Sequence, residues 1–250
     1  MEPTYRTLVI LARSLVLATG SRITYTDVEN IPERGGAVIA INHTSYLDWL
    51  PAALAVDRRH RRIRFMIKAE MQQVRAVNFL IKRTKTIPVN RGSGAGAYEV
   101  AVQRLREGQL VGVYPEATIS RSFELKEFKP GAARMAIEAD VPIVPMIVWG
   151  AQRVWTKDHP RQLSRRKFPV SVRVGVPLRP GADIAATDAA LRESMTGLLH
   201  EVQQRYPHPA GAYWVPNRLG GGAPTPAEAA RLDAEELAAR AAARTPHQSL

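Results

Sequence analysis

The sequence has no cysteine among its 250 residues. This absence excludes disulfide bonds, cysteine-based zinc sites and thiol nucleophiles. Near the N-terminus there is no apolar run long enough to cross a bilayer, because Arg13 interrupts the short stretch 8–18. We therefore expect residues 1–20 to form an interfacial amphipathic helix, with Arg6 and Arg13 on its polar side and four apolar side chains opposite: Leu8, Leu11, Leu15 and Val16. Packing of this helix on the protein's own core is the alternative.

Acidic residues are also few. The 35 Lys and Arg residues outnumber the 23 Asp and Glu residues, so the formal net charge is +12. Such a charge favours partners that carry phosphates: nucleic acid, an anionic membrane or a small phosphorylated substrate. The cations gather in three groups, which are Arg58, Arg59, Arg61, Arg62, Arg64 and Lys68; Lys82, Arg83 and Lys85; and Arg165, Arg166 and Lys167. A membrane-facing surface and a solvated basic face both remain open for them.

Short apolar segments alternate with helical patterns along the chain. We predict strands at 22–26, 37–41, 63–67, 87–89, 110–114 and 143–148, and a last strand at the sheet edge at 170–176. We predict helices at about 46–56, 70–82, 95–107, 131–139 and 187–205. This alternation is typical of an α/β fold, so we expect a single domain over residues 21–219 with a largely parallel central sheet flanked by helices.

The tail has a different composition. Gly220, Gly221, Gly222 and Pro224 predict a flexible hinge. The following segment 225–228 fits a capping box with proline at the first helical position, so it predicts a peripheral, alanine-rich helix. Residues 220–250 are therefore expected to form a hinge and a helical tail.

The most informative segment of the chain, residues 42–48, directly follows the predicted strand 37–41. His43 and Asp48 can form a general-base pair, because imidazole titrates near neutral pH and a carboxylate on its far nitrogen fixes the tautomer. Residues five apart on an ideal helix point about 140° away from each other. The pair can meet only if His43 lies on the strand-to-helix turn and Asp48 reaches back from the first helical turn. Chemistry in open α/β sheets gathers at such strand ends.

Asp48 has a second possible role. The segment Ser45-Tyr46-Leu47-Asp48 fits the pattern in which a serine N-cap is reciprocated by an acid three residues later. On this alternative, Asp48 only caps a helix.

Three later segments also deliver functional groups or a buried edge at predicted strand ends. Arg91 follows the strand at 87–89. A carboxylate, a hydroxyl and an arginine follow the strand at 110–114, namely Glu116, Thr118 and Arg121. The third segment, 141–145, is an apolar strand bounded by prolines.

In this order, the blocks resemble the PlsC-like lysophospholipid acyltransferases, the 1-acyl-sn-glycerol-3-phosphate acyltransferase family, over roughly residues 20–180. The His-x4-Asp block is 43–48, and the arginine block ends at Arg91. The family's Glu-Gly-Thr-Arg block appears as Glu116-Ala117-Thr118-Ile119, and the proline-bounded strand is 141–145. The segment Phe128-Lys129-Pro130-Gly131 also resembles the stretch that follows the third block.

The resemblance implies acyl transfer from a thioester donor, acyl-CoA or acyl carrier protein, to the hydroxyl of lysophosphatidic acid, with no cofactor, metal or covalent enzyme intermediate. His43 would remove the hydroxyl proton, and Asp48 would orient His43. Backbone N–H groups after His43 are candidates for stabilising the oxyanion. The glycerol phosphate would be held by Arg91, Glu116, Thr118 and Arg121, with Lys129 and the helix N-terminus near Gly131 as further donors. Because Glu116 repels phosphate, it would bind a hydroxyl or align an arginine.

Two residues depart from the family pattern. Ala117 replaces a glycine and adds a methyl group where backbone would approach the ligand, and Ile119 replaces an arginine and removes a phosphate contact. Arg121 can reach the same place, since a guanidinium binds phosphate through a bidentate fork. Acylation of another lysolipid or of a glycolipid hydroxyl is therefore the alternative function.

Other classes of protein explain less of the sequence. Residues 92–97 give a loose dinucleotide-binding pattern, but they lie far from the first strand–helix unit, and they lack the nucleophile-elbow spacing of serine hydrolases. A nucleic-acid-binding module would explain the charge but not the ordered blocks. We therefore expect no nucleic acid partner. The expected location is peripheral, on an anionic membrane surface at the cytoplasmic face of the cell membrane, without a transmembrane span.

Overall fold

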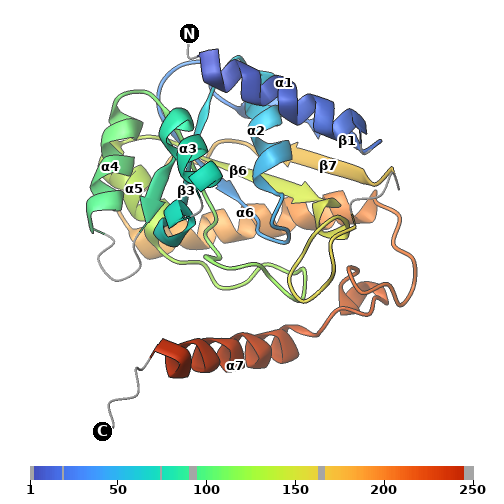
Figure 1. Ribbon diagram of the computed structural model, residues 1–250. Coiled ribbons are helices and arrows are strands. Elements are labelled where there is room, and N and C mark those ends of the chain that lie inside the picture. Colours follow the sequence, from blue (N-terminus) through green and yellow to red (C-terminus); the bar gives the residue numbers. More distant parts are fainter. Residues whose placement is uncertain (1–2, 19, 74, 90–94, 163–166, 245–250) are drawn as a thin grey trace, which may run out of the picture. The chain divides into compact units, whose positions relative to one another are not determined.

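The computed structural model describes residues 3–18, 20–73, 75–89, 95–162 and 167–244. In this part of the chain, seven strands form one sheet (Figure 1). They are β1 (Arg22–Thr26), β2 (Ala37–Ile41), β3 (Ile63–Lys68), β4 (Ile87–Val89), β5 (Leu110–Val113), β6 (Ile143–Trp149) and β7 (Pro169–Val174). The sequence predicted each of these strands, with bounds that agree within two residues.

The strand order is β1-β7-β6-β2-β5-β3-β4, and all neighbouring pairs are parallel except β6 and β7. The predicted edge position of the last strand is wrong. β1 pairs with β7 in parallel, with Arg22 opposite Pro169, so β7 is an interior strand. Its residues alternate between half-buried and buried, and this pattern is the one that an edge strand also shows.

Helices pack on both faces of the sheet. On one face, α2 (Trp49–Asp57) contacts β3, β6 and β7, and α1 (Pro3–Ala18) packs on α2. On the other face, α4 (Ala95–Arg106), α5 (Gly131–Ala139) and α6 (Ile184–Gln204) pack against one another and against β2, β4, β5, β6 and β7. The layered α/β architecture expected from the alternation of elements is confirmed.

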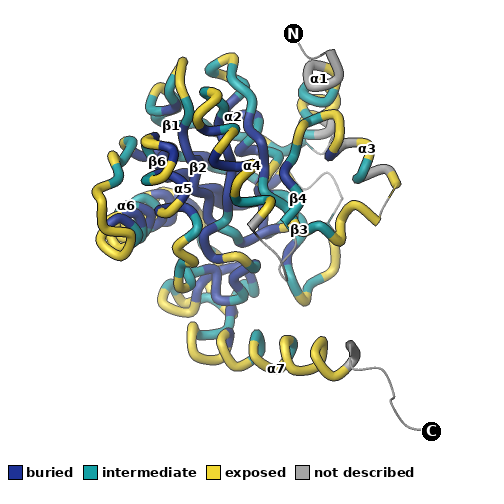
Figure 2. Tube along the Cα trace, turned by 90° about the vertical axis from the view of Figure 1, so that its left-hand side faces the viewer, coloured by how far each residue is buried: buried dark blue, intermediate teal, exposed yellow. Residues whose placement is uncertain are grey.

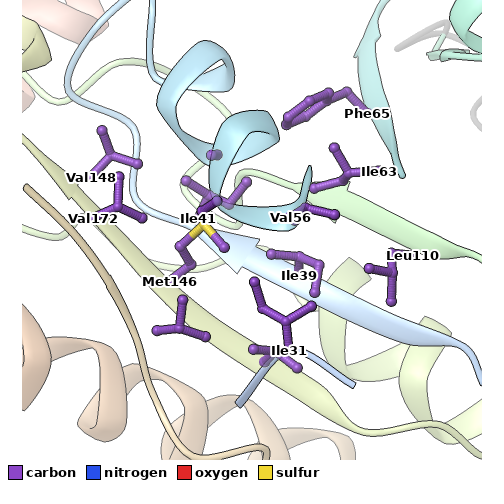
Figure 3. Close-up of a cluster of buried hydrophobic side chains, with 14 of the residues drawn as sticks. Ile31, Ile39, Ile41, Val56, Ile63, Phe65, Leu110, Met146, Val148 and Val172 are labelled. Atoms are coloured by element: carbon purple, nitrogen blue, oxygen red, sulfur yellow. The ribbon is translucent and has the colours of Figure 1, made fainter. Parts of the chain in front are cut away.

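The centre of the core is β2, whose five residues are fully buried (Figure 2). Side chains alternate between the faces of a strand. Ile39 and Ile41 join Val56 of α2 and Met146 of β6 in one hydrophobic cluster (Figure 3). The side chains at positions 38 and 40 point to the opposite face. A strand that is packed on both faces holds the residues that follow it in a fixed place.

Three helices differ from their predicted bounds. The helix expected from about residue 187 begins at Ile184 as α6. The helix expected from about residue 46 begins at Trp49, because the residues before it form a turn around the side chain of Asp48. The helix expected over 70–82 is divided into a 3-10 turn, η2 (Ala69–Gln73), and α3 (Arg75–Thr84).

Both expectations for the N-terminal helix describe part of α1. Leu8 and Val16 are half-buried, and Arg13 donates from Nη2 to Asp57 Oδ2 of α2 at 2.7 Å, so one side of α1 packs on the domain. Three large apolar side chains are nevertheless exposed: Ile10, Leu11 and Leu17. The side chains of Arg6 and Leu15 lie outside the described residues. None of the described helices combines the length and the hydropathy that a membrane crossing requires.

Part of the first basic group belongs to the interior. The Arg61 guanidinium donates to three backbone carbonyls at 2.7–2.8 Å, those of Pro32, Gly35 and Gly108. Arg64 is only 5% exposed and donates to the Thr84 carbonyl and to the Gln109 side chain. These two arginines satisfy backbone carbonyls. Arg64 is buried and Arg61 is half-buried, which the sequence alone did not indicate.

The structure divides the chain at positions that differ from the predicted domain boundaries. One compact unit runs to Ile119 and from Glu127 to Tyr206, and the second comprises Ser120–Lys126 and the chain from Pro207 onward. The glycines expected to form a flexible hinge lie inside the second unit. Gly222 donates to the Ala212 carbonyl, and a Cβ on Gly221 would lie 1.9 Å from the Val215 carbonyl oxygen. The segment is therefore a tightly packed turn.

The helix predicted after this turn is confirmed as α7 (Pro226–Arg244). Its capping box is also confirmed: the Glu228 N–H donates to Thr225 Oγ1, and the Thr225 N–H donates to Glu228 Oε2 at 2.8 Å. The reciprocal bonds satisfy two N–H groups at the helix start.

Candidate active site

The site begins where β2 leaves the sheet. Asn42, which follows β2, is fully buried and bonds through its side chain to both backbone groups of Val148 in β6. The amide donates to the Val148 carbonyl at 3.0 Å and accepts from the Val148 N–H at 2.7 Å. This side chain continues the β-ladder in place of backbone, so the chain turns away from the sheet at His43.

His43 and Asp48 meet in the way that the turn geometry predicted. The His43 Nδ1 and Asp48 Oδ2 atoms are 3.2 Å apart. The histidine side chain is 19% exposed, whereas the aspartate side chain is fully buried. A carboxylate at Nδ1 favours the tautomer with its proton on that nitrogen, which leaves Nε2 as the basic atom of the ring.

Burial raises the pKa of Asp48, and hydrogen bonds from His43 and from the turn oppose that rise. Oδ2 accepts from the N–H groups of Thr44 and Ser45 at 2.8 and 2.7 Å. Oδ1 has no hydrogen-bond partner among the residues that the structure describes. The Asp48 carboxylate is therefore shielded from solvent and lies next to Nδ1 of the imidazole.

The alternative roles considered for Asp48 are both present in the structure. Its carboxylate binds backbone N–H groups ahead of α2, as a capping acid does, and it also binds His43.

The backbone N–H groups that were predicted to bind an oxyanion have other partners. The N–H groups from His43 to Asp48 all bond to protein acceptors, because the turn is built by them. The expectation that these groups bind an oxyanion is therefore wrong for this conformation.

A loop after β6 holds the turn from the other side. Ser45 Oγ lies 3.1 Å from the Ala151 carbonyl oxygen and 2.7 Å from that of Trp155. Thr156 Oγ1 donates to the Thr44 carbonyl at 2.7 Å. Sequence reasoning considered Ser45 only as a helix cap and missed these contacts, since no pattern links the turn to residues more than a hundred positions away.

A tyrosine that the sequence did not single out covers the histidine ring. The rings of His43 and Tyr114 stack with centroids 4.1 Å apart and planes 22° apart. Tyr114 follows β5, and its other neighbour is Phe65 of β3 at 6.5 Å. Burial and the nearby Asp48 charge raise the pKa of the Tyr114 phenol well above its usual value. The Tyr114 phenol therefore stays uncharged, and its ring limits the rotation of the His43 side chain.

The Glu116 side chain contacts the backbone of the same histidine. The His43 N–H donates to Glu116 Oε1 at 2.8 Å, and the glutamate is 3% exposed. We expected this side chain to bind a hydroxyl or to align an arginine. The structure adds a role that the sequence did not indicate, because Glu116 joins the end of β5 to the His43–Asp48 turn after β2.

The residues that follow Glu116 form a strained turn. Ala117 has a φ of 60°, a left-handed conformation that a glycine adopts without strain. The Thr118 N–H donates to the Glu116 carbonyl at 2.8 Å, and Ile119 is buried. Backbone conformation thus gives a physical reason for glycine at position 117 in the family pattern, and the burial of Ile119 removes that position from any contact with a phosphate.

Two further predicted site residues are Lys129 and Arg91, of which the structure describes only Lys129. The Lys129 N–H donates to the Pro115 carbonyl at 2.8 Å, which brings this exposed lysine beside the Glu116 turn. Arg91 lies outside the described residues. Among those described, no group of three or more histidine, aspartate or glutamate side chains could hold a metal ion.

Arg121 has a different environment from the one expected. Its guanidinium, 8% exposed, donates from Nη1 to Asp233 and from Nη2 to Glu236 Oε2 at 2.8 Å, both on α7. These carboxylates occupy the two ends of the planar fork that was expected to bind phosphate. Sequence reasoning could not anticipate them, because α7 lies more than a hundred residues further along the chain.

Comparisons with known proteins identify the family of this chain. Residues 22–149, just over half of the chain, match the family model Acyltransferase. The 1-acyl-sn-glycerol-3-phosphate acyltransferase of Borreliella burgdorferi is 27% identical over 191 residues, covering 75% of this chain and 72% of that protein. The protein of the same name from Bacillus subtilis is 29% identical over 140 residues, covering 56% and 68%.

The fold agrees as well. The crystal structure of PlsC, the 1-acyl-sn-glycerophosphate (LPA) acyltransferase from Thermotoga maritima, is similar with a TM-score of 0.68 and 20% sequence identity, covering 81% of each chain. The match to the family model includes β2, the His43–Asp48 turn, the Glu116 turn and β6. This chain therefore belongs to the acyltransferase family.

Proposed function

We propose that this protein transfers a fatty acyl group from a thioester donor, acyl-CoA or acyl carrier protein, to the free hydroxyl of lysophosphatidic acid, giving phosphatidic acid. The observation that carries the proposal is the 3.2 Å contact between His43 Nδ1 and Asp48 Oδ2 at the end of the central strand. Two relatives with 27% and 29% identity bear the name of this activity. Buried Ile119, in place of an arginine, favours a second candidate, acylation of another lysolipid or of a glycolipid hydroxyl.

In the proposed mechanism, His43 Nε2 takes the proton from the acceptor hydroxyl as its oxygen attacks the thioester carbonyl. The tetrahedral intermediate then collapses, the carbon–sulfur bond breaks, and the imidazolium returns its proton to the leaving thiolate. No step forms a bond between the acyl group and the protein. General-base help of this kind contributes about 10²–10⁴-fold to the rate.

Asp48 supports the mechanism electrostatically. Its carboxylate is buried and therefore poorly solvated, as the raised pKa indicates. When the ring of His43 becomes positive, the buried charge gains a close partner, which favours the protonated ring during the reaction. The Tyr114 ring stacks on the imidazole, and Glu116 holds the His43 backbone, so both contacts help to position the base.

Glu116, Thr118 and Lys129 support an acceptor site next to the histidine. Thr118 and Lys129 lie on segments bonded to residues 115 and 116, and Glu116 itself contacts the His43 backbone. We assign the acceptor phosphate to Lys129 and to Arg91. A lysine side chain supplies three donors and a full positive charge for this purpose.

A lipid acceptor requires access to a membrane, and we propose peripheral attachment through α1 and α3. These helices pack against each other, and both expose large apolar side chains, with Phe79 of α3 54% exposed. Lys82 and Arg83 are exposed beside it. Apolar insertion combined with cations is the pattern of binding to an anionic leaflet. The lack of cysteine accords with the cytoplasmic face.

Removing the proposed base should abolish turnover without unfolding the protein. We expect His43→Ala to lose activity and Asp48→Asn to lower kcat by about 10²–10⁴-fold. Burial raises the pKa of Asp48, so the ionised carboxylate destabilises the fold as the pH rises from its usual pKa through the raised one. Asp48→Asn should therefore keep the free energy of unfolding at pH 7 within about 1 kcal/mol of the parent value. Steady-state kinetics and thermal melts measure both, and retained turnover in His43→Ala would refute the base role.

Glu116 should act through the backbone bond that it accepts. Glu116→Ala leaves the His43 N–H unpaired, which costs about 1–3 kcal/mol of stability and lowers kcat. Glu116→Gln keeps an acceptor oxygen, so it should retain most of kcat. If Glu116 instead served through its charge, both variants would be equally impaired and the acceptor KM would rise. His200→Ala on α6 provides a control substitution away from the site.

The acceptor is tested by a panel assayed with one acyl thioester. We expect kcat/KM for lysophosphatidic acid to exceed that for lysolipids or glycolipids without a terminal phosphate by at least about tenfold, or roughly 1.4 kcal/mol, the contribution of one charge-assisted hydrogen bond. Equal values across the panel would contradict the primary assignment and favour the second candidate.

Membrane attachment is tested with vesicles that contain anionic lipid. Lys82→Gln with Arg83→Gln should weaken binding by about 2 kcal/mol, or roughly thirtyfold, and added salt should reduce this difference. The matched control is Arg104→Gln with Arg106→Gln on α4, which removes the same charge from the opposite face of the sheet. Equal losses from both pairs, or tighter binding to an oligonucleotide than to vesicles, would contradict the proposed surface.

A further inference from the structure

Arg121, which is ion-paired to α7, lies close in the sequence to the candidate site. Arg121 lies five residues after Glu116, and buried Ile119 anchors the chain between them. The loop that contains Arg121, residues 120–126, belongs to the same compact unit as α7. Only a few covalently linked residues separate this loop from the turn that carries Glu116 and Thr118.

The loop is fixed to α7 by several charged contacts. Arg121 bonds to Asp233 and Glu236, and Lys126 bonds to Asp233 as well. Glu236 also pairs with Arg240 of its own helix, so the two carboxylates are shared among three cations. These side chains are largely shielded, since Arg121 is 8% and Asp233 19% exposed, so the pairs are weakened less by solvent than ordinary surface pairs.

Further contacts hold the same loop. Arg218 Nε donates to Glu124 Oε1 at 2.5 Å, and Ser120 Oγ donates to the Glu124 carbonyl at 2.7 Å. Phe123 is 2% exposed, with a φ of 57°. Buried Phe123 and several charged contacts thus hold this loop, and α7 supplies two of the carboxylates, Asp233 and Glu236.

We propose that Asp233 and Glu236 of α7 are positioning residues for acceptor binding, which act by holding Arg121 and with it the segment 116–121. Arg121 is then a tether and not a ligand of the acceptor phosphate. The inference rests on the proposed function in one respect, namely that segment 116–121 contributes to the acceptor side of the site. On this proposal α7 contributes to acceptor binding through Arg121, without contacting the acceptor itself.

A double-mutant cycle tests the tether. Arg121→Gln and Glu236→Gln should each raise the KM for the acceptor by about tenfold, with kcat and the KM for the donor unchanged, and the double variant should be no worse than either single one. Glu235→Gln is the matched control, because Glu235 is exposed on the same helix and pairs with Arg231 of that helix. It should leave all kinetic constants unchanged.

Two outcomes would overturn the proposal. If Arg121 binds the acceptor phosphate directly, Glu236→Gln frees the guanidinium and lowers the acceptor KM, whereas Arg121→Gln raises it. If the pairs serve stability alone, the variants lower the melting temperature and leave the acceptor KM unchanged.

Amide hydrogen exchange separates failure of this proposal from failure of the proposed function. Without any substrate, Glu236→Gln and Arg121→Gln should speed exchange in residues 116–126 and leave β2 unchanged, whereas Glu235→Gln should match the parent protein. This result does not depend on which lipid is the acceptor. Unchanged exchange in residues 116–126 would refute the tether even if lysophosphatidic acid proves to be the substrate.

Discussion

The fully buried carboxylate of Asp48 lies behind the end of the central strand, and the geometry of the site depends on how its charge is satisfied. Oδ2 accepts from two backbone N–H groups of the turn and contacts His43 Nδ1. A carboxylate removed from water is tolerated only with such donors. The turn before α2 therefore has little freedom to change shape, because any other conformation would leave a charge unpaired in the core.

The sheet brings the partners of this turn together. β2 has β5 and β6 as its parallel neighbours, so the carboxyl ends of all three strands meet at the same edge. β5 leads to Tyr114 and Glu116, which contact the ring and the backbone of His43, and β6 leads to the loop with Thr156. The neighbours of β2 thus hold the ring of His43 through Tyr114, and they hold the backbone of its turn through Glu116 and Thr156.

The sequence predicted the elements of the fold well because their signals are local. Apolar runs and helical periodicity gave every strand within two residues, and the spacing of His43 and Asp48 predicted their contact from the geometry of a turn. Predictions that depended on more distant neighbours were less accurate. β7 has the alternation of an edge strand, but β1, nearly 150 residues earlier, pairs with it. Arg61 and Arg64 have the sequence pattern of surface cations, but they donate to the backbone carbonyls of residues 32 and 84.

Composition and motif order by themselves determined the α/β class, the acyltransferase resemblance and the identity of the histidine and aspartate. These features are written in neighbouring residues, and the physical rules that connect them act over a few positions. Tertiary structure alone decided that Glu116 supports the His43 backbone, that Tyr114 covers its ring, and that Arg121 pairs with α7. Such contacts join residues 70 to 115 positions apart, and their partners become neighbours only when the sheet and the helices are packed.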